Sequence, residues 1–344
     1  MQAVHVTAHG GPEVVQLVDL PIPEPGPGEV RARVLGVSVN HLDLWVRNGM
    51  PGMPLPLPMI PGCDGCGVVD AVGAGVTLQV GQPILLEPGY NDDLSSPEVR
   101  RGEDHLAADY KIRGEHTDGF AREYVVLPER YCTRLPKGLD PVTTAAAPLT
   151  FLTAWGMLIE RARITSSDTV LVLGATSGVG SAGIQIARHH GAQVITTAST
   201  EAGRAMGLDL GAHHAIDHAD PEWFKRVKSL TNGRGVDVVM EHVGPATWRG
   251  SMSCLARNGR LVTCGGTTGP KVDILLPHLF IKNLSLLGST MGPRSAFPLI
   301  LERLAAGDYR APLDRTLPLS SVHEAHRLLE ERQVLGKIVL IPGE

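Results

Sequence analysis

The segment Asp168–Gly183 constrains the fold more than any other part of the chain, because a buried strand, a glycine-rich turn and a helix start follow one another within it. Thr169–Leu173 is a run of β-branched and aliphatic residues, which is typical of a strand buried on both faces. Gly178-x-Gly180-x-x-Gly183 follows, and Ile184–Arg188 continues with helical spacing. The segment therefore predicts a strand–turn–helix unit of a parallel sheet.

The three glycines have distinct physical roles in such a unit. We expect Gly178 to make the tight turn, Gly180 to let the backbone approach a pyrophosphate, and Gly183 to let helix and strand pack closely. The helix start offers unpaired N–H groups and a positive dipole end to phosphates. Because 40 of the 344 residues are glycine, the pattern alone is weak, and a loop that binds nothing is the alternative. The flanking strand and helix favour dinucleotide binding.

Length and composition exclude several classes of function. The 344 residues suffice for two domains, and 43% hydrophobic residues is ordinary for a soluble protein. The net charge of −5, with scattered lysine and arginine, and only 4% aromatic residues argue against nucleic acid as a partner. Five cysteines form no disulfide framework, and the chain has neither a signal-peptide layout nor an apolar run that spans a membrane. We expect a cytoplasmic protein without a membrane partner.

The first 130 residues predict an antiparallel, barrel-like β domain, because short alternating segments are separated by proline and glycine turns. We expect Asn40–Arg47 to be a short helix, Met50–Gly62 to be an extended loop because it holds five prolines, and Tyr90–Glu115 to be a polar surface lobe. The expected strands lie near residues 4–7, 14–18, 29–39, 67–72 and 119–127.

From Pro141 onward the pattern changes to alternating strands and helices. Thr143–Arg161 predicts an alanine-rich helix that leads into the strand at Thr169. Further strands are expected near 193–198, 214–217, 236–242, 260–265 and 284–289, with helices near 180–190, 201–211, 221–231, 245–257 and 294–306. Such alternation indicates right-handed βαβ units and a parallel sheet. A last helix, Val322–Gln333, and a last strand, Gly336–Ile341, suggest that the chain returns to the first domain.

Taken together, these segments resemble the medium-chain dehydrogenase/reductase superfamily, especially its quinone oxidoreductase and zinc-type alcohol dehydrogenase-like branches. The resemblance rests on the glycine turn and on residues 10–14, 61–69, 148–155 and 336–340. It implies an α/β protein with a GroES-like β-barrel catalytic domain at 1–133, a Rossmann doubly wound parallel-sheet domain at 134–310, and a return to the catalytic domain at 311–344. It also implies an active site between these domains and a dimer, or dimer of dimers, made through sheet edges near Leu284–Thr290.

The same resemblance raises the question of zinc. Zinc-dependent members carry their catalytic ligands at positions that match Asn40, Cys63 and the neighbourhood of Thr150. An amide, one thiol and a hydroxyl are a poor set, since catalytic zinc needs three protein ligands, so we expect no catalytic metal. Cys63-x-x-Cys66 is either half of a metal or redox site or, as we favour, a pair of small packed residues.

The surface lobe bears on a second zinc site. Members with a structural zinc carry four clustered cysteines there, and this lobe contains none, so we expect no structural zinc. Its acidic residues, including Asp92, Asp93, Glu103 and Asp104, leave a carboxylate-bound cation as a minor alternative to a solvated face.

Two residues bear on the choice between NADPH and NADH. NAD-specific sites carry an acidic residue at the end of the second strand, where this chain has Ser199. Serine can donate to a 2′-phosphate and Arg204 can add positive charge, so NADP(H) is favoured over NAD(H), with Glu201 the residue that opposes this choice. Strand ends and positions that match the family predict further cofactor contacts at Thr153, Gly178, Val179, Gly180, Val243, Cys264, Gly265, Gly266, Ser289 and Lys337.

Without zinc, the expected hydride acceptor is a quinone or an α,β-unsaturated carbonyl compound, because conjugation spreads the incoming charge. Asn40 is the candidate for hydrogen-bonding the carbonyl or the nicotinamide ribose, and His41, Asp43 and Asp64 are candidates for proton delivery. Trp45 stands where many zinc-independent relatives have a tyrosine, so it is expected to line the pocket. Two alternatives stay open: an alcohol dehydrogenase with an atypical metal site at Cys63, and a non-catalytic nucleotide-binding protein that acts as a redox sensor or interacts with RNA.

Overall fold

The computed structural model describes residues 1–50, 52 and 54–343, which form two compact units. Unit 1 consists of Met1–Leu149 and Arg294–Glu344, and unit 2 consists of Thr150–Pro293. The domain boundaries at 133 and 310 that the resemblance implies stay a prediction. No helix among the described residues is long and apolar enough to cross a membrane.

Unit 1 is built on a seven-stranded sheet in the order β16-β17-β3-β4-β5-β9, with β8 also paired to β3. Neighbours run antiparallel except β16 and β17, which are parallel. The strands are β3 (Glu29–Ser38), β4 (Asp64–Val72), β5 (Pro83–Leu86), β8 (Tyr124–Pro128), β9 (Cys132–Arg134), β16 (Leu313–Pro318) and β17 (Lys337–Ile341). The predicted antiparallel architecture and the returning last strand are confirmed.

Short elements complete unit 1. Two small sheets pair β1 (Gln2–Val6) with β2 (Val15–Asp19) and β6 (Gly89–Tyr90) with β7 (Lys111–Ile112). The helices are α1 (His41–Asn48), α2 (Pro97–Arg100), α3 (Pro141–Thr144), α10 (Phe297–Ala306) and α11 (Val322–Glu330).

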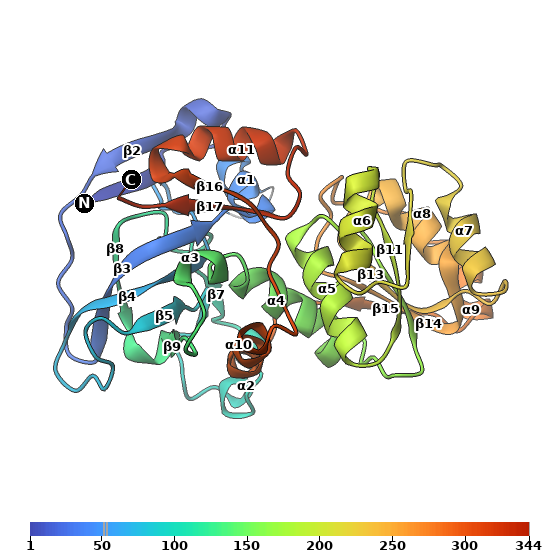
Figure 1. Cartoon of the computed structure of the whole chain (residues 1–344), viewed down its shortest axis with the longest axis horizontal. Helices are drawn as coiled ribbons and strands as arrows, with labels where there is room; N and C mark the ends of the chain where they lie inside the picture. The colour runs from blue at the N-terminus through green and yellow to red at the C-terminus, as the bar shows by residue number, and fades with distance from the viewer. Residues whose placement is uncertain (51, 53, 344) are drawn as a thin grey trace. The chain divides into compact units, whose positions relative to one another are not determined.

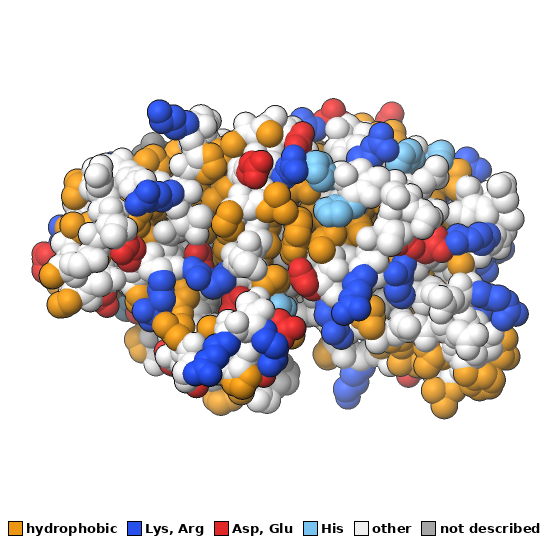
Figure 2. All heavy atoms as spheres, turned by 90° about the horizontal axis from the view of Figure 1, so that it is seen from below, with side chains coloured by type: hydrophobic (Ala, Val, Ile, Leu, Met, Phe, Trp, Pro, Cys, Tyr) orange, Lys and Arg blue, Asp and Glu red, His pale blue; other side chains and the backbone are white. Residues whose placement is uncertain are grey.

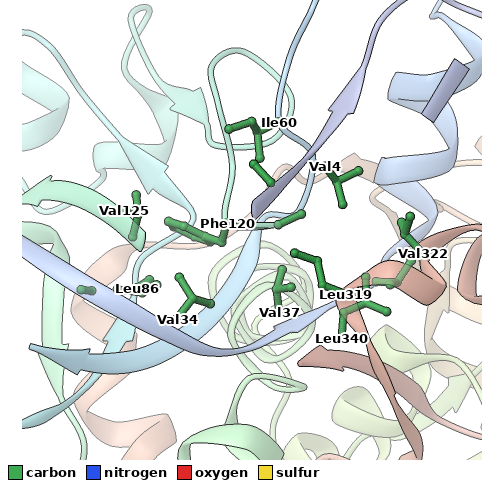
Figure 3. Packing of buried hydrophobic residues seen from close by; sticks show 14 of the residues in the cluster. Val4, Val34, Val37, Ile60, Leu86, Phe120, Val125, Leu319, Val322 and Leu340 are labelled. Atoms are coloured by element: carbon green, nitrogen blue, oxygen red, sulfur yellow. The ribbon is translucent and has the colours of Figure 1, made fainter. Parts of the chain in front are cut away.

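A hydrophobic core cluster of unit 1 is shown in Figure 3. The alternate residues Val30, Ala32 and Val34 of β3 belong to it, as one face of a half-buried sheet requires. Val37 joins the same cluster beyond the shift in pairing between Val34 and Gly36. Phe120 lies fully buried among them, and Leu319 and Val322 of the C-terminal segment join the same cluster. The two ends of the chain therefore contribute to one core, which explains why the last strand returns to this unit.

Unit 2 is a six-stranded parallel sheet in the order β12-β11-β10-β13-β14-β15. Its strands are β10 (Thr169–Val172), β11 (Gln193–Thr197), β12 (His214–Ile216), β13 (Val236–Glu241), β14 (Leu255–Thr263) and β15 (Ser285–Gly288). Figure 1 shows α5 (Gly178–His189) and α6 (Glu201–Asp209) on one side of this sheet, and α7 (Trp223–Leu230), α8 (Pro245–Cys254) and α9 (Leu276–Ile281) on the other. The predicted doubly wound α/β class is confirmed, with its strand order reversing beside β10.

Three predicted elements differ from the structure. The stretch 143–161 is not one helix: α3 ends at Thr144, α4 (Pro148–Trp155) follows, and a π-helix covers Gly156–Arg161. Pro148 has no N–H to donate and disfavours helix in the residue before it, which explains the break.

The second and third differences concern strand boundaries. The helix predicted to end at Arg257 ends at Cys254, because buried Leu255 pairs with Val236 in the sheet. The strand predicted from residue 119 begins at Tyr124. Between Met50 and Gly62, where an extended loop is expected, the described residues form no helix or named strand, and residues 51 and 53 lie outside the described part of the chain.

Candidate functional site

The glycine turn of unit 2 is formed by a different glycine from the one predicted. Gly174, two residues after the last residue of β10, has φ = +65°, whereas Gly178 is already the first residue of α5. Gly174 lies beside His242, and its N–H donates to Thr197 Oγ1 (3.2 Å). Assigning the tight turn to Gly178 was therefore wrong, because the chain reverses where β10 ends and only glycine adopts that backbone conformation easily.

Helix α5 begins close against the strands, and two glycines make this possible. A Cβ on Gly180 would lie 2.1 Å from the carbonyl oxygen of Gly174, and one on Gly183 would lie 2.4 Å from Met240 Sδ. Ser177 caps the helix by accepting the N–H of Gly180 (2.8 Å). The N–H groups of Gly178 and Val179 have no acceptor within the helix, since helix geometry leaves N-terminal donors unpaired. This small-residue cradle with outward N–H groups fits the pyrophosphate of a dinucleotide.

Strands β13, β14 and β15 follow β10 across the parallel sheet, so their carboxyl ends lie at the same end of the sheet as the start of α5. Val243 follows β13, the Cys264–Gly266 segment follows β14, and Ser289 follows β15, where its N–H donates to Thr263 O (2.9 Å). His242 is buried and its Nε2 lies 2.8 Å from Leu173 O, which ties β13 to the end of β10. Burial lowers the pKa of His242, so the neutral ring is favoured. The predicted contacts Val243, Cys264–Gly266 and Ser289 therefore all follow the carboxyl ends of strands.

Glu241, the last residue of β13, lies at this end of the sheet and was not identified from the sequence. Its carboxylate is fully buried and accepts the N–H groups of Val243 (2.8 Å) and Gly244 (3.0 Å) through Oε1. The hydroxyls of Thr247 (3.0 Å) and Ser251 (2.6 Å) donate to Oε2. The available signal was an acid that follows directly on the apolar run Val238–Met240 within the strand. Glu241 fixes the backbone of the turn that carries Val243.

Ser199 and Arg204 lie where β11 passes into α6. Ser199 is exposed, and Thr200 caps the helix by accepting the N–H of Gly203 (3.1 Å). Arg204 Nη1 lies 3.1 Å from Asp217 Oδ2, so an ion pair already balances part of its charge. Arg204 also lines an open cavity of about 520 Å³ beside β12.

Thr153 lies on α4 and is buried, and its Oγ1 donates to Met291 Sδ (3.7 Å). Met291 has φ = +48°, and its carbonyl oxygen lies 1.9 Å from where a Cβ on Gly156 would be. The segment after β15 therefore packs directly on the start of the π-helix that follows α4, and the close approach of the Met291 carbonyl oxygen requires glycine at position 156.

A second polar cluster, in unit 1, is assembled by strand register. Strand β17 pairs antiparallel with β3, with Val339 opposite Ser38 and Leu340 opposite Val37. Extending that register by two residues sets Lys337 opposite Asn40. Strand β4 starts at Asp64, which is paired with Ser38 on the other side of β3. Residues far apart in sequence thus meet at one end of β3.

The hydrogen bonds of this cluster engage every polar group of Asn40. Its Nδ2 donates to Asp64 Oδ2 (2.8 Å), Ser38 O (3.3 Å) and Cys63 Sγ (3.4 Å), and its Oδ1 accepts from Lys337 Nζ. Lys337 Nζ also donates to Val39 O (2.9 Å) and lies 3.4 Å from Asp64 Oδ2. Asp64 Oδ1 accepts the N–H of Leu149. Asp64 is fully buried and Lys337 is 5% exposed, so the ion pair lies away from water.

Burial shapes the protonation of the neighbouring groups. Asp43 accepts the N–H groups of Asn40 (2.7 Å) and Gly62 (2.9 Å), and burial raises its pKa to about 6. Burial also raises the pKa of Asp64, and burial together with these two carboxylates raises the pKa of the Cys63 thiol. A thiol kept protonated is a poor nucleophile and a poor metal ligand.

The residues of this cluster do not fit zinc. The amide oxygen of Asn40 is bonded to an ammonium, and its Nδ2 donates to Cys63 Sγ (3.4 Å). Within residues 1–50, 52 and 54–343, no group of three or more histidine, cysteine, aspartate or glutamate side chains has the arrangement of a metal site. His41 starts α1 and is half-buried, as is Trp45 on the same helix.

The acidic residues of the surface lobe are engaged within the protein. Asp109 Oδ2 accepts the N–H groups of Asp92 and Asp93 (both 2.7 Å), and Lys111 forms an ion pair with Asp92 (2.5 Å). These contacts engage Asp92, Asp93 and Asp109 within the lobe.

Comparisons with known proteins agree with this geometry. A family model described as alcohol dehydrogenase GroES-like domain matches residues 26–137, and one described as zinc-binding dehydrogenase matches residues 178–306. The chain is 31% identical to the quinone oxidoreductase of Pseudomonas aeruginosa, covering 98% of this chain and 99% of that protein. It is 29% identical to a 2-haloacrylate reductase from a Burkholderia species, with 99% of each covered. The crystal structure of an NAD-dependent alcohol dehydrogenase is 43% identical and superimposes with a TM-score of 0.96 over the whole of both chains.

Proposed function

The chain belongs to the medium-chain dehydrogenase/reductase superfamily of oxidoreductase enzymes, and on this basis we propose that it is a zinc-independent reductase that transfers hydride from a nicotinamide dinucleotide to a quinone or an α,β-unsaturated carbonyl compound. The observation that carries the proposal is the bonding of Asn40 and Asp64 to the Lys337 ammonium. An ammonium that is bonded to protein oxygens does not act as a Lewis acid that stabilises the alkoxide formed from an isolated ketone. A conjugated acceptor needs less help, because it spreads the negative charge of the added hydride over its own π system.

The dinucleotide supplies the hydride when bound, and the chain supplies binding and orientation. We propose that Gly178, Val179 and Gly180 hold the pyrophosphate at the start of α5. Val243, Cys264, Gly265, Gly266 and Ser289, with Thr153 on α4, are proposed to surround the nicotinamide end, because ligands of open parallel sheets bind at the carboxyl ends of the strands.

Among the proposed catalytic residues, Asn40, Asp43 and Asp64 are buried, whereas His41 is half-buried. We therefore propose His41 as the group that delivers a proton to the reduced acceptor, since its ordinary pKa lies near neutrality. Asn40, Asp43 and Asp64 are proposed to shape the pocket wall beside it.

The test is a panel of steady-state assays with 1,4-quinones, 2-alkenals and primary alcohols, each run with both dinucleotides. We expect quinone or alkenal reduction that is unchanged after exhaustive dialysis against a chelator. Alcohol oxidation that is lost on chelation and restored by zinc would contradict the proposal.

We further propose that NADPH is preferred over NADH, because Ser199 stands where a carboxylate would repel the 2′-phosphate and Arg204 lies one turn on. We expect Ser199→Asp to raise the KM for NADPH by roughly 10- to 100-fold, the equivalent of one lost charge-assisted hydrogen bond, and to leave the KM for NADH nearly unchanged. Arg204→Ala should act in the same direction. Equal effects on both dinucleotides would remove the basis for the preference.

Alcohol oxidation with NAD is the second candidate function. It is favoured by the 43% identity to a protein described as an NAD-dependent alcohol dehydrogenase. Chelator-resistant alcohol oxidation in the same panel would select it.

A second copy of the chain is the proposed partner. The segment before the edge strand β15 exposes Leu275 (73%), Leu276 (65%) and Phe280 (66%). Figure 2 shows hydrophobic side chains gathered on the surface of unit 2. Such a patch marks an interaction surface, so we propose a homodimer through this edge, which sedimentation equilibrium tests. The proposed location is the cytoplasm, in keeping with five cysteines that all remain free thiols.

A further inference from the structure

A buried ammonium stands at the centre of the polar cluster in unit 1. We propose that Lys337 is a positioning residue whose ammonium fills a cation site made of Val39 O, Asn40 Oδ1 and Asp64 Oδ2, and thereby orients the Asn40 amide and keeps divalent metal ions out. The inference deepens the proposed zinc-independent reaction and rests on it for its catalytic consequence. That Lys337 fills the cation site and orients Asn40 is argued from contacts within unit 1 and does not depend on the reaction.

The contacts of Lys337 account for all three of its N–H donors. Val39 O, Asn40 Oδ1 and Asp64 Oδ2 are three acceptors for three hydrogens. No donor is left over for a substrate oxygen, so Lys337 acts through the groups it holds. Its side chain reaches them because β17 pairs with β3 in the register that sets position 337 opposite position 40.

The ammonium determines which way the Asn40 amide faces. An amide has nearly the same shape after a half-turn about its last bond, so only its partners select the orientation. Lys337 donates to Oδ1 on one side, and Asp64 accepts from Nδ2 on the other (2.8 Å). Without the ammonium, Oδ1 loses its donor, and the amide is no longer fixed from both sides.

The same ammonium balances buried negative charge. Asp64 is fully buried and Asp43 is 2% exposed, and Lys337 attracts both carboxylates. Removing one partner of a buried ion pair leaves an uncompensated charge in a region of low dielectric constant, which is strongly unfavourable. The oxygens around Lys337 would then form an empty, negatively charged site for a cation.

One residue of this cluster, Asn40, stands at a position where the family resemblance locates a zinc ligand, and Asp64 directly follows another such position, Cys63. The Asn40 amide oxygen is engaged by the ammonium, and Asp64 is engaged by the ammonium, the Asn40 amide and the Leu149 N–H. A divalent ion bound to these oxygens would have to displace a positive charge that is already bonded to them. Lys337 thus takes the place of a metal ion in organising this cluster.

Chemical rescue of the full-length Lys337→Ala variant tests the inference. Alanine keeps Cβ and removes three carbons and the nitrogen, so propylammonium matches the missing atoms. We expect the variant to lose roughly 100-fold in kcat for quinone reduction, the loss typical of a displaced active-site group. Propylammonium should recover at least about a tenth of the lost activity with a saturable dependence, and should raise the melting temperature. Tetramethylammonium, which has no N–H donor, should do neither.

Two controls make the outcome specific. Lys337→Met keeps the aliphatic stem without the charge, so we expect low activity that propylammonium does not restore, because the stem occupies its space. Lys225→Ala removes a surface lysine that forms an ion pair with exposed Glu222, and should behave as the unmodified protein does with and without amine.

Metal content gives a readout that is independent of activity. After dialysis against Co²⁺, the unmodified protein should hold less than one equivalent in this site, and Lys337→Ala should bind Co²⁺ at least about tenfold more tightly, since one opposing charge has been removed. Stoichiometric cobalt in the unmodified protein would overturn both this inference and the zinc-independent function. Amine effects on melting temperature no larger than those of tetramethylammonium would overturn the inference alone, whatever the protein reduces.

Discussion

Gly180→Ala is expected to weaken dinucleotide binding by at least roughly 100-fold, because the added methyl group has no room between α5 and the end of β10. A Cβ at this position would lie 2.1 Å from Gly174 O, 2.7 Å from Leu173 O and 2.8 Å from Ser177 Oγ. Two of these atoms belong to the backbone, so side-chain rearrangement cannot relieve the overlap. The start of α5 must move, and the N–H groups of Gly178 and Val179 move with it.

Fluorescence titration with NADPH and NADH measures the loss, and thermal unfolding measures the accompanying destabilisation. Lys225→Ala is the control, because it lies in the same unit and its side chain is exposed at the surface, away from the residues proposed to contact the cofactor. It should bind both dinucleotides as the unmodified protein does. Normal binding by Gly180→Ala would show that the start of α5 is not the phosphate site.

The sequence predicted the regular elements of unit 2 well, because local signals and long-range packing agree there. A buried apolar strand followed by a glycine turn admits few structures, and β10 through α5 lie where the pattern indicated. The turn residue itself was wrong. The spacing of Gly178, Gly180 and Gly183 matched a known pattern, yet the reversal of the chain happens at Gly174, two residues after the last residue of the strand. Spacing along the sequence did not show where the strand ends.

The polar cluster of unit 1 was only partly predictable. Asn40, Asp43 and Asp64 were singled out, and the structure brings them together. The environment of Lys337 could not be foreseen, because its partner Asn40 is 297 residues away and their meeting depends on the register of β17 on β3. A lysine near the end of a chain is usually exposed, and only the pairing of strands reveals a buried ammonium. Its predicted contact with the cofactor stays a prediction.

Glu241→Ala is expected to reduce the free energy of unfolding by about 3–5 kcal/mol, because it removes the acceptor for four buried donors at once. The N–H groups of Val243 and Gly244 and the hydroxyls of Thr247 and Ser251 all lose their partner. The turn after β13 then loses its defined position, and kcat should fall together with stability if Val243 borders the nicotinamide as proposed.

Glu241→Gln separates the charge from the geometry. Oε1 accepts the backbone N–H groups of Val243 and Gly244, which can only donate, and Oε2 accepts from the hydroxyl of Ser251. The Thr247 hydroxyl lies 3.0 Å from both oxygens. Hydroxyl groups can also accept, so glutamine can keep its oxygen toward the backbone and turn its NH₂ group toward the hydroxyls. We therefore expect glutamine to cost only about 1–2 kcal/mol, clearly less than alanine.

Urea unfolding of both variants, beside Glu222→Ala as a surface control expected to change stability by less than about 0.5 kcal/mol, measures this order. Glu222 is an exposed residue that forms an ion pair with Lys225 at the surface, so its loss should leave the sheet intact. Equal losses for alanine and glutamine would mean that the negative charge, rather than the four directed hydrogen bonds, holds the turn. In that case the hydrogen bond from the Val243 N–H to Glu241 would not determine where Val243 lies. The geometric reason for assigning Val243 a fixed place at the end of the sheet would then be lost.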